Sequence, residues 1–310
     1  MADVVIAEFM EEGAVASLSG RYDTLYDPEL VADPEALAGQ LAGARALIVR
    51  NRTQVNEKLL AAADALQVVG RLGVGLDNIA LDACRARGIA VIPASGANDD
   101  AVAEYVIAGA LVLRRGACFA TEEVAAGQWP RNRLMGREAL GATMGFVGFG
   151  SIARATARRA GALGMRMIAH DPFVADDDPA WADCDVAPRS LHALLGESDV
   201  VSLHVPLSDA TRNLVDAAAL ARMKPDAILI NTSRGGVVDE TALADALRSN
   251  RLGAAMLDVF ETEPLPGGGP LLGVPNLILT PHIAGVTQES NFRVSRMIAE
   301  KVIEALSALP

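Results

Sequence analysis

A glycine-rich segment in the middle of the chain has the spacing of a nucleotide-binding loop. GFVGFGSIARATARRAG, residues 145–161, places Gly148, Gly150 and Ala153 in a G-x-G-x-x-A arrangement between a predicted strand and a predicted helix. The first glycine allows a tight turn and the second lets the backbone approach a pyrophosphate. The small alanine lets helix and strand pack closely, while the helix N-terminus faces the anion. The segment therefore predicts dinucleotide binding.

The choice of dinucleotide depends on Asp171, which ends the next predicted strand, 21 residues after Gly150. A carboxylate at this position can accept hydrogen bonds from the adenosine ribose hydroxyls and repels a 2′-phosphate. No arginine follows it in HDPFVADDD, residues 170–178. NAD is therefore predicted rather than NADP. A glycine turn in another kind of α/β domain is the alternative, and strand, helix and acid together favour the dinucleotide site.

Three polar side chains lie further along the chain, each just beyond the carboxyl end of a predicted strand. They are Arg234 in NTSRGG, Glu263 in DVFETEP and His282 in TPHIAG. Open α/β sheets place their ligand sites at these strand ends. The spacings of 29 and 19 residues cannot come from one helix face, so only the fold can bring the three groups together. A lone histidine after a strand is usually a packed or solvated residue, and it is the shared context that marks His282.

The elements that must position these residues are ten short apolar runs that alternate with helix-like segments. The runs are continuous rather than alternating in polarity, which is typical of strands covered on both faces. We therefore predict an α/β fold with parallel sheets. The runs span residues 4–9, 46–49, 66–73, 89–93, 144–149, 166–171, 199–205, 227–233, 254–260 and 277–282.

A long apolar helix candidate at residues 101–116 interrupts this rhythm, and a segment with few apolar residues follows it. We therefore predict two domains, with the second sheet starting near Gly141. The last segment, from Gln288 onward, has the pattern of one amphipathic helix with no strand after it. Such a helix is expected to pack back across another part of the molecule.

Composition excludes several classes of protein. The 310 residues are 51% hydrophobic and 21% charged, which suffices for two domains with buried cores. The net charge of −12 argues against nucleic-acid and anionic-membrane partners. Residues 1–13 lack a basic n-region, so we expect no secretory leader and a cytoplasmic location. Three scattered cysteines and four histidines show no ligand spacing, so no metal site is predicted.

The order of motifs along the chain resembles the D-isomer-specific 2-hydroxyacid dehydrogenase family, which includes 3-phosphoglycerate dehydrogenases. The motifs are RLGVGLDN, GFVGFGSIA, HVPL, NTSRGGVVDETAL, LDVFETEP and TPHIAG, and the match covers nearly the whole chain. The resemblance implies two doubly wound parallel-sheet domains with a cleft between them. A flavodoxin-like substrate-binding domain of residues 1–97, completed by residues 287–310, would carry an inserted Rossmann NAD-binding domain of residues 98–286.

The resemblance also implies a reaction, in which an NAD-dependent enzyme interconverts a D-2-hydroxyacid and its 2-keto acid by hydride transfer. Arg234 would clamp the substrate carboxylate, and His282 would exchange a proton with the substrate oxygen. Glu263 would orient the imidazole and stabilise its charged form. A glutamate at position 263 separates this chain from formate dehydrogenases of the same superfamily, which use a glutamine.

For the cofactor, the resemblance implies a set of contacts beyond the glycines and Asp171. Ser151 and Ile152 would border the pyrophosphate, and Val205 and Pro206 the adenine side. Ile152, Val205 and Pro206 could also be simple packing residues. The full implied set is Gly148, Gly150, Ser151, Ile152, Asp171, Val205, Pro206, Thr232 and Ser233 at the nicotinamide ribose, Asp258 at the carboxamide, and Gly285.

The substrate is expected to be a small anionic acid, because in the family the backbone N–H groups of Val74 and Gly75 also meet its carboxylate and Asn98 can face it. Arg50, Arg52 and Arg71 would lie near its third carbon. If residues 50–52 were extended, both guanidinium groups would point the same way and could meet one oxyanion. This favours a three-carbon acid with a second anion, of the 3-phosphoglycerate or 3-sulfolactate type. Surface salt bridging is the alternative role for Arg50 and Arg52.

The same motifs are also compatible with two other functions. A glyoxylate or hydroxypyruvate reductase would act on substrates without a second anion, and a non-enzymatic NAD-sensing corepressor would share the fold. Asp99 and Asp100 depart from the usual family pattern and either start the following helix or weaken anion binding in the cleft. The family is usually dimeric through the helix at 101–116, so a homodimer is expected. The sequence ends at Pro310, so control by serine through a C-terminal regulatory domain is not expected.

Overall fold

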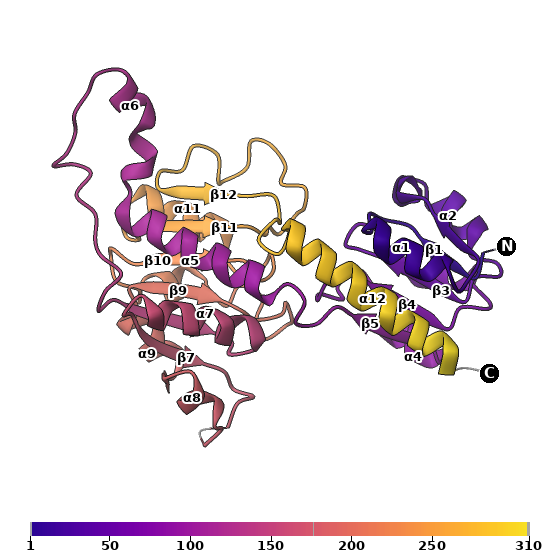
Figure 1. Ribbon diagram of the computed structural model, residues 1–310. Helices are drawn as coiled ribbons and strands as arrows, with labels where there is room; N and C mark the ends of the chain where they lie inside the picture. The colour runs from indigo at the N-terminus through magenta and orange to yellow at the C-terminus, as the bar shows by residue number, and fades with distance from the viewer. Residues whose placement is uncertain (1, 176, 309–310) are drawn as a thin grey trace. The chain divides into compact units, whose positions relative to one another are not determined.

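The computed structural model describes residues 2–175 and 177–308, which form two compact units (Figure 1). The first unit comprises the chain up to Asn98 together with the segment from Val286 onward, and the second runs from Asp99 to Gly285. Each unit contains one fully parallel sheet with helices packed against it. The predicted α/β fold class with two parallel-sheet domains is confirmed. None of the described helices is long and apolar enough to cross a membrane.

The first unit has a five-stranded sheet in the order β2-β1-β3-β4-β5, which is the flavodoxin-like order. Its strands are short, and the three central ones, β1, β3 and β4, are mostly buried, which matches their continuous apolar runs in the sequence. The strands are β1 (Val4–Ile6), β2 (Thr24–Tyr26), β3 (Ala46–Val49), β4 (Val68–Arg71) and β5 (Ala90–Pro93). The helical segments are α1 (Glu12–Ser19), η1 (Pro28–Ala32), α2 (Pro34–Gln40), α3 (Glu57–Ala61), α4 (Leu81–Ala86) and α12 (Gln288–Ala308).

The C-terminal helix α12 is part of this first unit. Its buried side chains, including Val294, Ile298 and Val302, join one core cluster with residues of β1, β3 and β4. Gly70 in β4 makes this contact close, because a Cβ there would lie 2.8 Å from Cγ2 of Ile298. The segment that follows the last strand of the second unit therefore completes the core of the first.

The second unit has a seven-stranded sheet in the order β12-β11-β10-β9-β6-β7-β8. The strands are β6 (Thr143–Val147), β7 (Arg166–His170), β8 (Val186–Pro188), β9 (Val200–Leu203), β10 (Ile228–Asn231), β11 (Ala254–Leu257) and β12 (Leu277–Leu279). The helical segments are α5 (Asp99–Arg115), η2 (Ala117–Ala120), α6 (Thr121–Ala125), α7 (Ser151–Ala162), α8 (Ala180–Asp183), α9 (Leu191–Glu197), α10 (Ala217–Leu220) and α11 (Glu240–Arg248). The order reverses between β9 and β6, which is the topological switch point of a doubly wound sheet.

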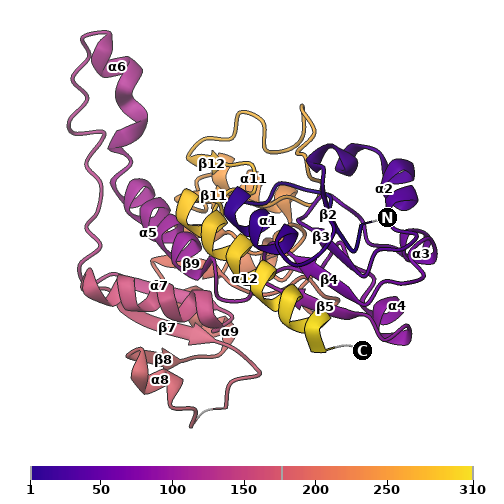
Figure 2. The same cartoon turned by 45° about the vertical axis from the view of Figure 1, so that its right-hand side comes forward.

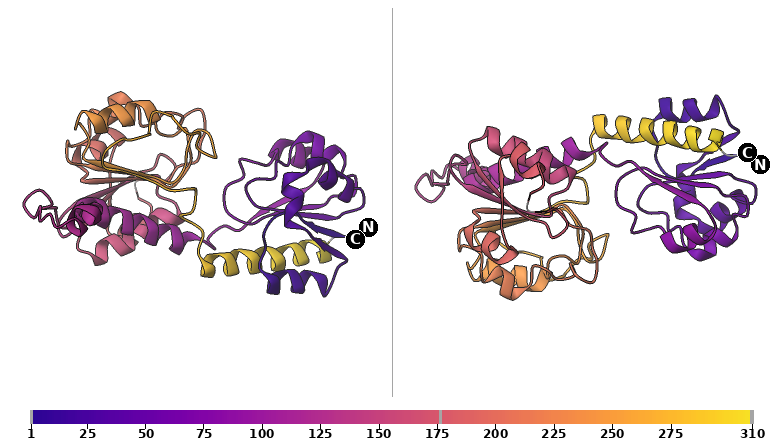
Figure 3. Two further views of the ribbon diagram at one scale, coloured as in Figure 1. Left: turned by 90° about the horizontal axis from the view of Figure 1, so that it is seen from above. Right: turned by 90° about the horizontal axis from the view of Figure 1, so that it is seen from below.

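Two separate core clusters cover the two faces of the second sheet. Helices α5 and α7 pack in one cluster, and α9, α10 and α11 pack in the other. Figure 3 shows the helical layers on either side of the strands. Residues buried on α5 include Val106 and Ala110, so much of the apolar character of segment 101–116 is explained by packing within its own unit.

Two strands of the structure, β2 and β8, were missing from the sequence prediction. Each is three residues long and lies at an edge of its sheet, where only one neighbour is hydrogen-bonded. Their residues are mainly half-buried or exposed, so they lack the continuous apolar run that identified the central strands. The sequences of β2 and β8, TLY and VAP, contain no more than two consecutive aliphatic residues, whereas β12, also a three-residue edge strand, has the sequence LIL and was predicted.

An arm extends from the end of α5 through η2 and α6 and the following loop. Figures 1 and 2 show it projecting away from the sheet of the second unit. Residues 117–140 of this arm carry large apolar side chains in solvent, namely Phe119, Val124, Trp129, Met135 and Leu140. Trp129 is 74% exposed and Met135 79%, which is unusual for such side chains in a monomer.

Candidate active site

The glycine loop follows β6 directly and has the shape that a pyrophosphate requires. Gly148 has φ +88°, and a Cβ there would lie 2.5 Å from the backbone oxygen of His204, so only glycine fits. At Gly150 a Cβ would meet nothing within 4 Å, which leaves the backbone open to a ligand. Gly150 provides no side-chain cap for α7, so the first N–H groups of that helix are suited to an anion.

Asp171 links the end of β7 to this loop. Its Oδ2 accepts a hydrogen bond from the N–H of Phe149 at 2.8 Å, and its Oδ1 accepts one from the N–H of Phe173 at 2.9 Å. Because a carboxylate oxygen can accept more than one hydrogen bond, both oxygens can still meet ribose hydroxyls. The sequence-predicted pair of glycine loop and acid is therefore joined directly, and these residues fit a dinucleotide.

The other predicted cofactor residues lie on several elements of the same unit. Ser151 and Ile152 form the first turn of α7, and Ile152 also packs against the core. Val205 packs against the opposite core cluster, while Pro206 is exposed. Thr232, just after β10, has a buried Oγ1 with no hydrogen-bond partner among the described residues. Gly285 is the last residue of the unit.

The turn that carries Arg234 is organised by Asn231, the last residue of β10. The Asn231 side chain is 1% exposed, and its Oδ1 accepts hydrogen bonds from the N–H of Ser233 at 3.0 Å and from its hydroxyl at 2.7 Å. Its Nδ2 donates to the backbone oxygen of Arg234 at 2.9 Å. The next residue, Gly235, lies so close to the 258–263 loop that a Cβ would be 1.7 Å from the oxygen of Phe260.

Glu263 and His282 form the closest polar pair of the site. Nδ1 of His282 lies 2.7 Å from Oε2 of Glu263, and Oε1 of Glu263 accepts the N–H of Phe260 at 3.0 Å. Partial burial would raise the pKa of Glu263, but the hydrogen bonds from His282 and Phe260 and the charge of Arg234 outweigh burial and hold this pKa below its ordinary value. Glu263 therefore stays ionised and fixes the proton of the neutral imidazole on Nδ1.

His282 is held in an unusual backbone conformation by Asp258. The φ of His282 is +53°, in the left-handed region that side chains rarely adopt, and its N–H donates to the backbone oxygen of Asp258 at 2.8 Å. The buried carboxylate of Asp258 accepts the N–H groups of Ile283 at 2.9 Å and Ala284 at 2.8 Å. Asp258 therefore clamps the backbone on the C-terminal side of the histidine.

A chain of hydroxyl groups extends this clamp. The Thr280 hydroxyl donates to Oδ1 of Asp258 at 2.6 Å, and the Tyr105 hydroxyl on α5 donates to Oγ1 of Thr280 at 2.7 Å. Burial raises the pKa of Tyr105, with the hydrogen bond to Thr280 opposing and the charge of Asp258 adding to the rise. The tyrosine therefore stays protonated and can donate.

In the first unit, the loop after β3 differs from the geometry expected for it. Residues 51–53 form bends instead of continuing the strand, so the premise of an extended chain, on which Arg50 and Arg52 would point the same way, is wrong. The cause is Glu8, whose buried carboxylate accepts N–H groups of Arg50, Arg52 and Thr53 and turns the backbone around itself. Arg50 is half-buried, lies over the Phe9 ring and donates to Oδ1 of Asn291, while Arg52 is exposed.

The RLGVG segment of the first unit has a distinct role for one glycine. Gly73 has φ +151°, and a Cβ there would lie 1.5 Å from Nη1 of Arg71, so glycine makes room for this guanidinium across the loop. Val74 and Gly75 follow, and Val74 is 36% exposed. Asn98 has a buried Oδ1 with no hydrogen-bond partner among the described residues.

The two acidic residues that departed from the family pattern lie in the first turn of α5. Asp100 pairs with Arg159 of α7 at 2.7 Å, so it stabilises helix packing. Oδ1 of Asp99 is buried without a partner within residues 2–175 and 177–308. Acids in this turn also interact favourably with the helix dipole.

The family model described as "D-isomer specific 2-hydroxyacid dehydrogenase, NAD binding domain" matches residues 107–284, more than half of the chain. The chain belongs to the D-isomer-specific 2-hydroxyacid dehydrogenase family. The matched range lies within the second unit and contains the glycine loop and the Glu263–His282 pair. The predictions of the family, of NAD as cofactor and of an NAD-dependent 2-hydroxyacid dehydrogenase are confirmed.

Named relatives of this dehydrogenase agree with the match. The chain is 58% identical over 306 residues to the (S)-sulfolactate dehydrogenase of Chromohalobacter salexigens, covering 99% of both proteins. It is 38% identical over 304 residues to the D-3-phosphoglycerate dehydrogenase of Mycobacterium leprae, covering 98% of this chain and 57% of that protein. A D-lactate dehydrogenase from Aquifex aeolicus, complexed with NAD and lactic acid, has a TM-score of 0.85 at 27% identity and covers 98% of this chain and 95% of its own.

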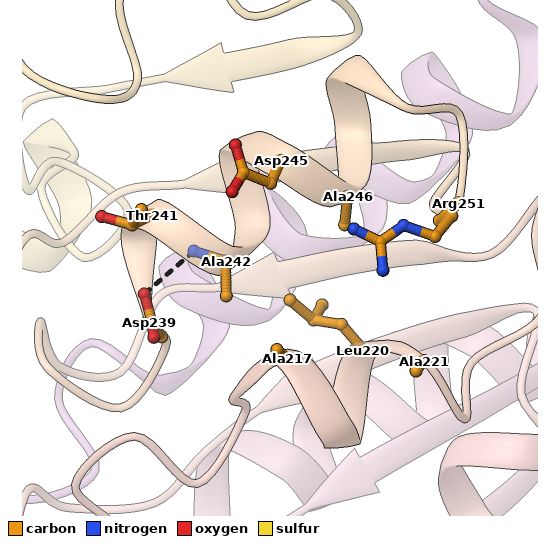
Figure 4. A pocket seen from close by; sticks show the side chains of 9 residues that line it. All are labelled: Ala217, Leu220, Ala221, Asp239, Thr241, Ala242, Asp245, Ala246 and Arg251. Carbon is orange, nitrogen blue, oxygen red and sulfur yellow. Dashed lines mark hydrogen bonds between the residues drawn. The ribbon is translucent and has the colours of Figure 1, made fainter.

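The dehydrogenase has a groove that is separate from the candidate active-site residues. It lies between α10 and α11, is lined by residues such as Leu220, Asp239 and Arg251, and has a volume of about 220 Å³ (Figure 4). Asp239 already caps α11 through the N–H of Ala242 at 2.9 Å. None of the predicted site residues lines this groove, so it has no part in the candidate active site.

The sequence did not reveal the residues that position the dehydrogenase's catalytic side chains and the loop of residues 50–53. Some of these residues belong to no charge pattern in the sequence, and others lie far along the chain from the motif that they support. Asn231 and Thr280 could have been suspected, since each is a polar residue at or just beyond the end of an apolar strand. No sequence signal linked Glu8 or Tyr105 to the loops that they contact. These five are Glu8, Asn78, Tyr105, Asn231 and Thr280.

Proposed function

We propose that this dehydrogenase oxidises (S)-sulfolactate to 3-sulfopyruvate with NAD. The observation that carries the reaction is the 2.7 Å hydrogen bond between ionised Glu263 and His282, which is the arrangement of an oriented general base. The 58% identity to a sulfolactate dehydrogenase supports the substrate, and arginines in the first unit supply charge for its second anion.

The stereochemical label of this substrate agrees with the family name. In D-lactate the carboxylate outranks the methyl group, and the centre is labelled R. In sulfolactate the sulfur-bearing carbon outranks the carboxylate, so the same spatial arrangement is labelled S. An enzyme that acts on D-2-hydroxyacids is therefore expected to act on (S)-sulfolactate.

His282 carries the proton of the reaction in this proposal. With Nδ1–H donated to Glu263, the neutral imidazole presents the lone pair of Nε2, which accepts the hydroxyl proton of the substrate as the C–O bond becomes a carbonyl. Bound NAD supplies the acceptor for the hydride that leaves C2. Glu263 stabilises the resulting imidazolium, and in the reductive direction Nε2 returns the proton to the keto oxygen.

Arg234 binds the substrate carboxylate through its planar guanidinium group, which can form two parallel hydrogen bonds. Asn231 fixes the backbone of this turn, so the guanidinium starts from a defined position. The backbone N–H groups of Val74 and Gly75 and the amide of Asn98 are proposed as further contacts with the acid. Arg50, Arg52 and Arg71 recognise the sulfonate at the far end of the substrate.

The remaining cofactor contacts are proposed on the same basis. The glycine loop and first turn of α7 hold the pyrophosphate, and Asp171 holds the adenosine ribose. The unpartnered hydroxyl of Thr232 is suited to the nicotinamide ribose. Asp258 uses its carboxylate to hold the His282 backbone and can accept one further hydrogen bond from the carboxamide. Ser233, Val205, Pro206 and Gly285 complete the proposed set.

The test is a substrate panel with purified enzyme and NAD: sulfolactate, 3-phosphoglycerate, glycerate and lactate, for wild type and Arg52→Ala. We expect sulfolactate to give the highest kcat/KM in the wild type. Arg52→Ala should lower kcat/KM about tenfold for the two substrates with an anionic tail, because a charged hydrogen bond is lost, and change it little for lactate. Equal losses on all four substrates would contradict the proposed role of Arg52.

We further propose that the protein is a cytoplasmic homodimer. The exposed apolar side chains on the arm at residues 117–140 support the dimer, since a second copy would remove them from water. The apolar face of α5, in contrast, is already buried within its own unit. Light scattering after size exclusion should give the mass of two chains, and Trp129→Asp together with Met135→Asp should shift the protein to monomer.

A further inference from the structure

Glu8 is a buried acid with no role in the reaction proposed above. It lies two residues beyond β1, and only 5% of its surface is exposed. Its Oε1 accepts the N–H groups of Arg50 and Thr53, both at 2.9 Å, and its Oε2 accepts the N–H of Arg52 at 3.3 Å. These three donors are backbone amides, so they satisfy its hydrogen-bonding capacity without adding a positive charge.

The same loop is held from its other side by Asn78 of the RLGVGLDN motif. Nδ2 of Asn78 donates to the backbone oxygen of Thr53 at 2.7 Å and to that of Arg50 at 3.3 Å. Glu8 therefore holds the N–H groups of Arg50, Arg52 and Thr53, and Asn78 holds the C=O groups of Arg50 and Thr53. The arginine side chains start from a backbone with little freedom.

The charge of Glu8 also acts on the arginines of this loop. Burial lowers the pKa of Arg50, and the negative charge of Glu8 opposes this shift. Arg50 is further placed by the Phe9 ring, 6.0 Å from its Cζ, and by Oδ1 of Asn291. Glu8 thus lies within electrostatic range of a group that is proposed to bind the substrate's tail.

Glu8 and the charged residues of this loop and of the neighbouring loop sum to a small positive charge. Arg50 and Arg52 contribute two positive charges and Glu8 one negative charge, which leaves one. Arg71 and Asp77 of the neighbouring loop add one of each sign and leave the sum unchanged. A sulfonate carries one negative charge, whereas a phosphate monoester carries between one and two at neutral pH.

We propose that Glu8 is a specificity-determining residue that weakens the binding of a doubly charged phosphate tail at the arginine loop of residues 50–53, relative to a singly charged sulfonate tail. The inference rests on the proposed function, in which this loop binds the second anion. By Coulomb's law, the buried carboxylate repels a dianion about twice as strongly as a monoanion at the same position. Glu8 therefore disfavours phosphoglycerate while it holds the loop that binds sulfolactate.

The experiment compares Glu8→Gln with wild type by the ratio of kcat/KM for 3-phosphoglycerate to that for sulfolactate. Glutamine keeps the Oε1 that serves Arg50 and Thr53 and replaces only the oxygen with the longest contact. Removal of one buried charge should raise this ratio about three- to tenfold. A ratio that stays constant or falls would overturn the inference, because a purely structural role affects both substrates alike.

The matched control is Glu12→Gln, which removes one exposed negative charge from the first turn of α1 in the same unit. It should leave the ratio at the wild-type value. Failure of the proposed function gives a different pattern: Arg52→Ala would then weaken sulfolactate and lactate equally. If Arg52→Ala is selective and Glu8→Gln leaves the ratio unchanged, only the inference about Glu8 fails.

A second measurement repeats this comparison at two pH values, and Glu8→Ala takes the place of Glu8→Gln if the glutamine variant does not fold. The second pKa of a phosphate monoester is about 6, whereas a sulfonate keeps one charge throughout. The rise in the ratio that follows removal of the Glu8 charge should therefore be larger at about pH 8 than at about pH 5.5, where the phosphate tail becomes a monoanion like the sulfonate. A rise of equal size at both pH values would contradict discrimination by charge.

Discussion

Oε2 of Glu263 lies 2.7 Å from Nδ1 of His282, although 19 residues separate them in the chain. The two loops meet because β11 and β12 are neighbouring parallel strands whose carboxyl ends share one edge of the sheet. Asp258 follows β11 and fastens the backbone after His282 through Ile283 and Ala284. The sheet topology thus brings Glu263 and His282 together, and the buried carboxylate of Asp258 aligns the backbone at His282.

Replacing Glu263 with glutamine should lower kcat for sulfolactate oxidation by about tenfold to a hundredfold, within the range of general acid–base contributions. A neutral partner stabilises the imidazolium less, so the acidic limb of the pH–rate profile should move to lower pH. Stopped-flow and steady-state kinetics over a pH series measure both effects. An unchanged profile would show that Glu263 does not control the protonation of His282.

Replacing Arg234 with alanine should lower kcat/KM by about a thousandfold, because a bidentate charged contact to the carboxylate is lost at the reacting end of the substrate. NADH binding, followed by fluorescence, should persist, since the cofactor contacts are elsewhere in the same unit. The lysine variant serves as a matched control that keeps the charge without the planar fork, and it should recover only part of the loss.

Tyr105→Phe should lower the free energy of unfolding by about 1 kcal/mol, because the Thr280 hydroxyl loses its half-buried donor. We also expect a lower kcat with little change in KM, since the chain from Tyr105 through Thr280 to Asp258 ends at the His282 backbone. Urea unfolding and steady-state kinetics check the two effects. The matched control Tyr22→Phe, in the first unit, should leave kcat unchanged.

His204 should make stability depend on pH. Burial lowers its pKa to about 4, and Oγ of Ser202 lies 2.9 Å from its Nε2. The unfolded chain therefore binds a proton between about pH 6.5 and pH 4 that the folded protein does not, so this contribution is complete above pH 6.5 and falls as pH drops toward 4, by up to about 3 kcal/mol. Urea unfolding of wild type and His204→Gln at several pH values measures it, and equal slopes in both proteins would contradict the assignment.

The sequence predicted the central strands because they are buried on both faces, and the glycine loop with Asp171 because steric and charge requirements restrict the residue types there. It did not predict β2 or β8, whose sequences TLY and VAP contain no more than two consecutive aliphatic residues. It also did not predict how Arg50 and Arg52 point, since this depends on Glu8, which is 42 residues from Arg50 in the chain.

The predicted roles of Arg234, Glu263 and His282 came from motif resemblance, and the geometry adds the residues that hold them. Asn231, Thr280 and Tyr105 act through backbone amides and hydroxyls, and such contacts depend on the packing of β10, β12 and α5. A single sequence contains no pattern that links a helix residue such as Tyr105 to a loop residue such as Thr280, about 175 residues away. Supporting residues of this kind become visible only in three dimensions.

The backbone at His282, the proton carrier, has a left-handed conformation that favours a residue other than histidine. Asparagine and glycine adopt φ +53° more readily than histidine, so His282→Asn or His282→Gly should relieve about 1 kcal/mol of backbone strain. Thermal unfolding should show these inactive proteins to be about as stable as the active one, because this relief offsets the loss of the hydrogen bond to Glu263. Selection for stability alone would thus not retain the histidine, and libraries designed to raise thermostability should hold this position fixed.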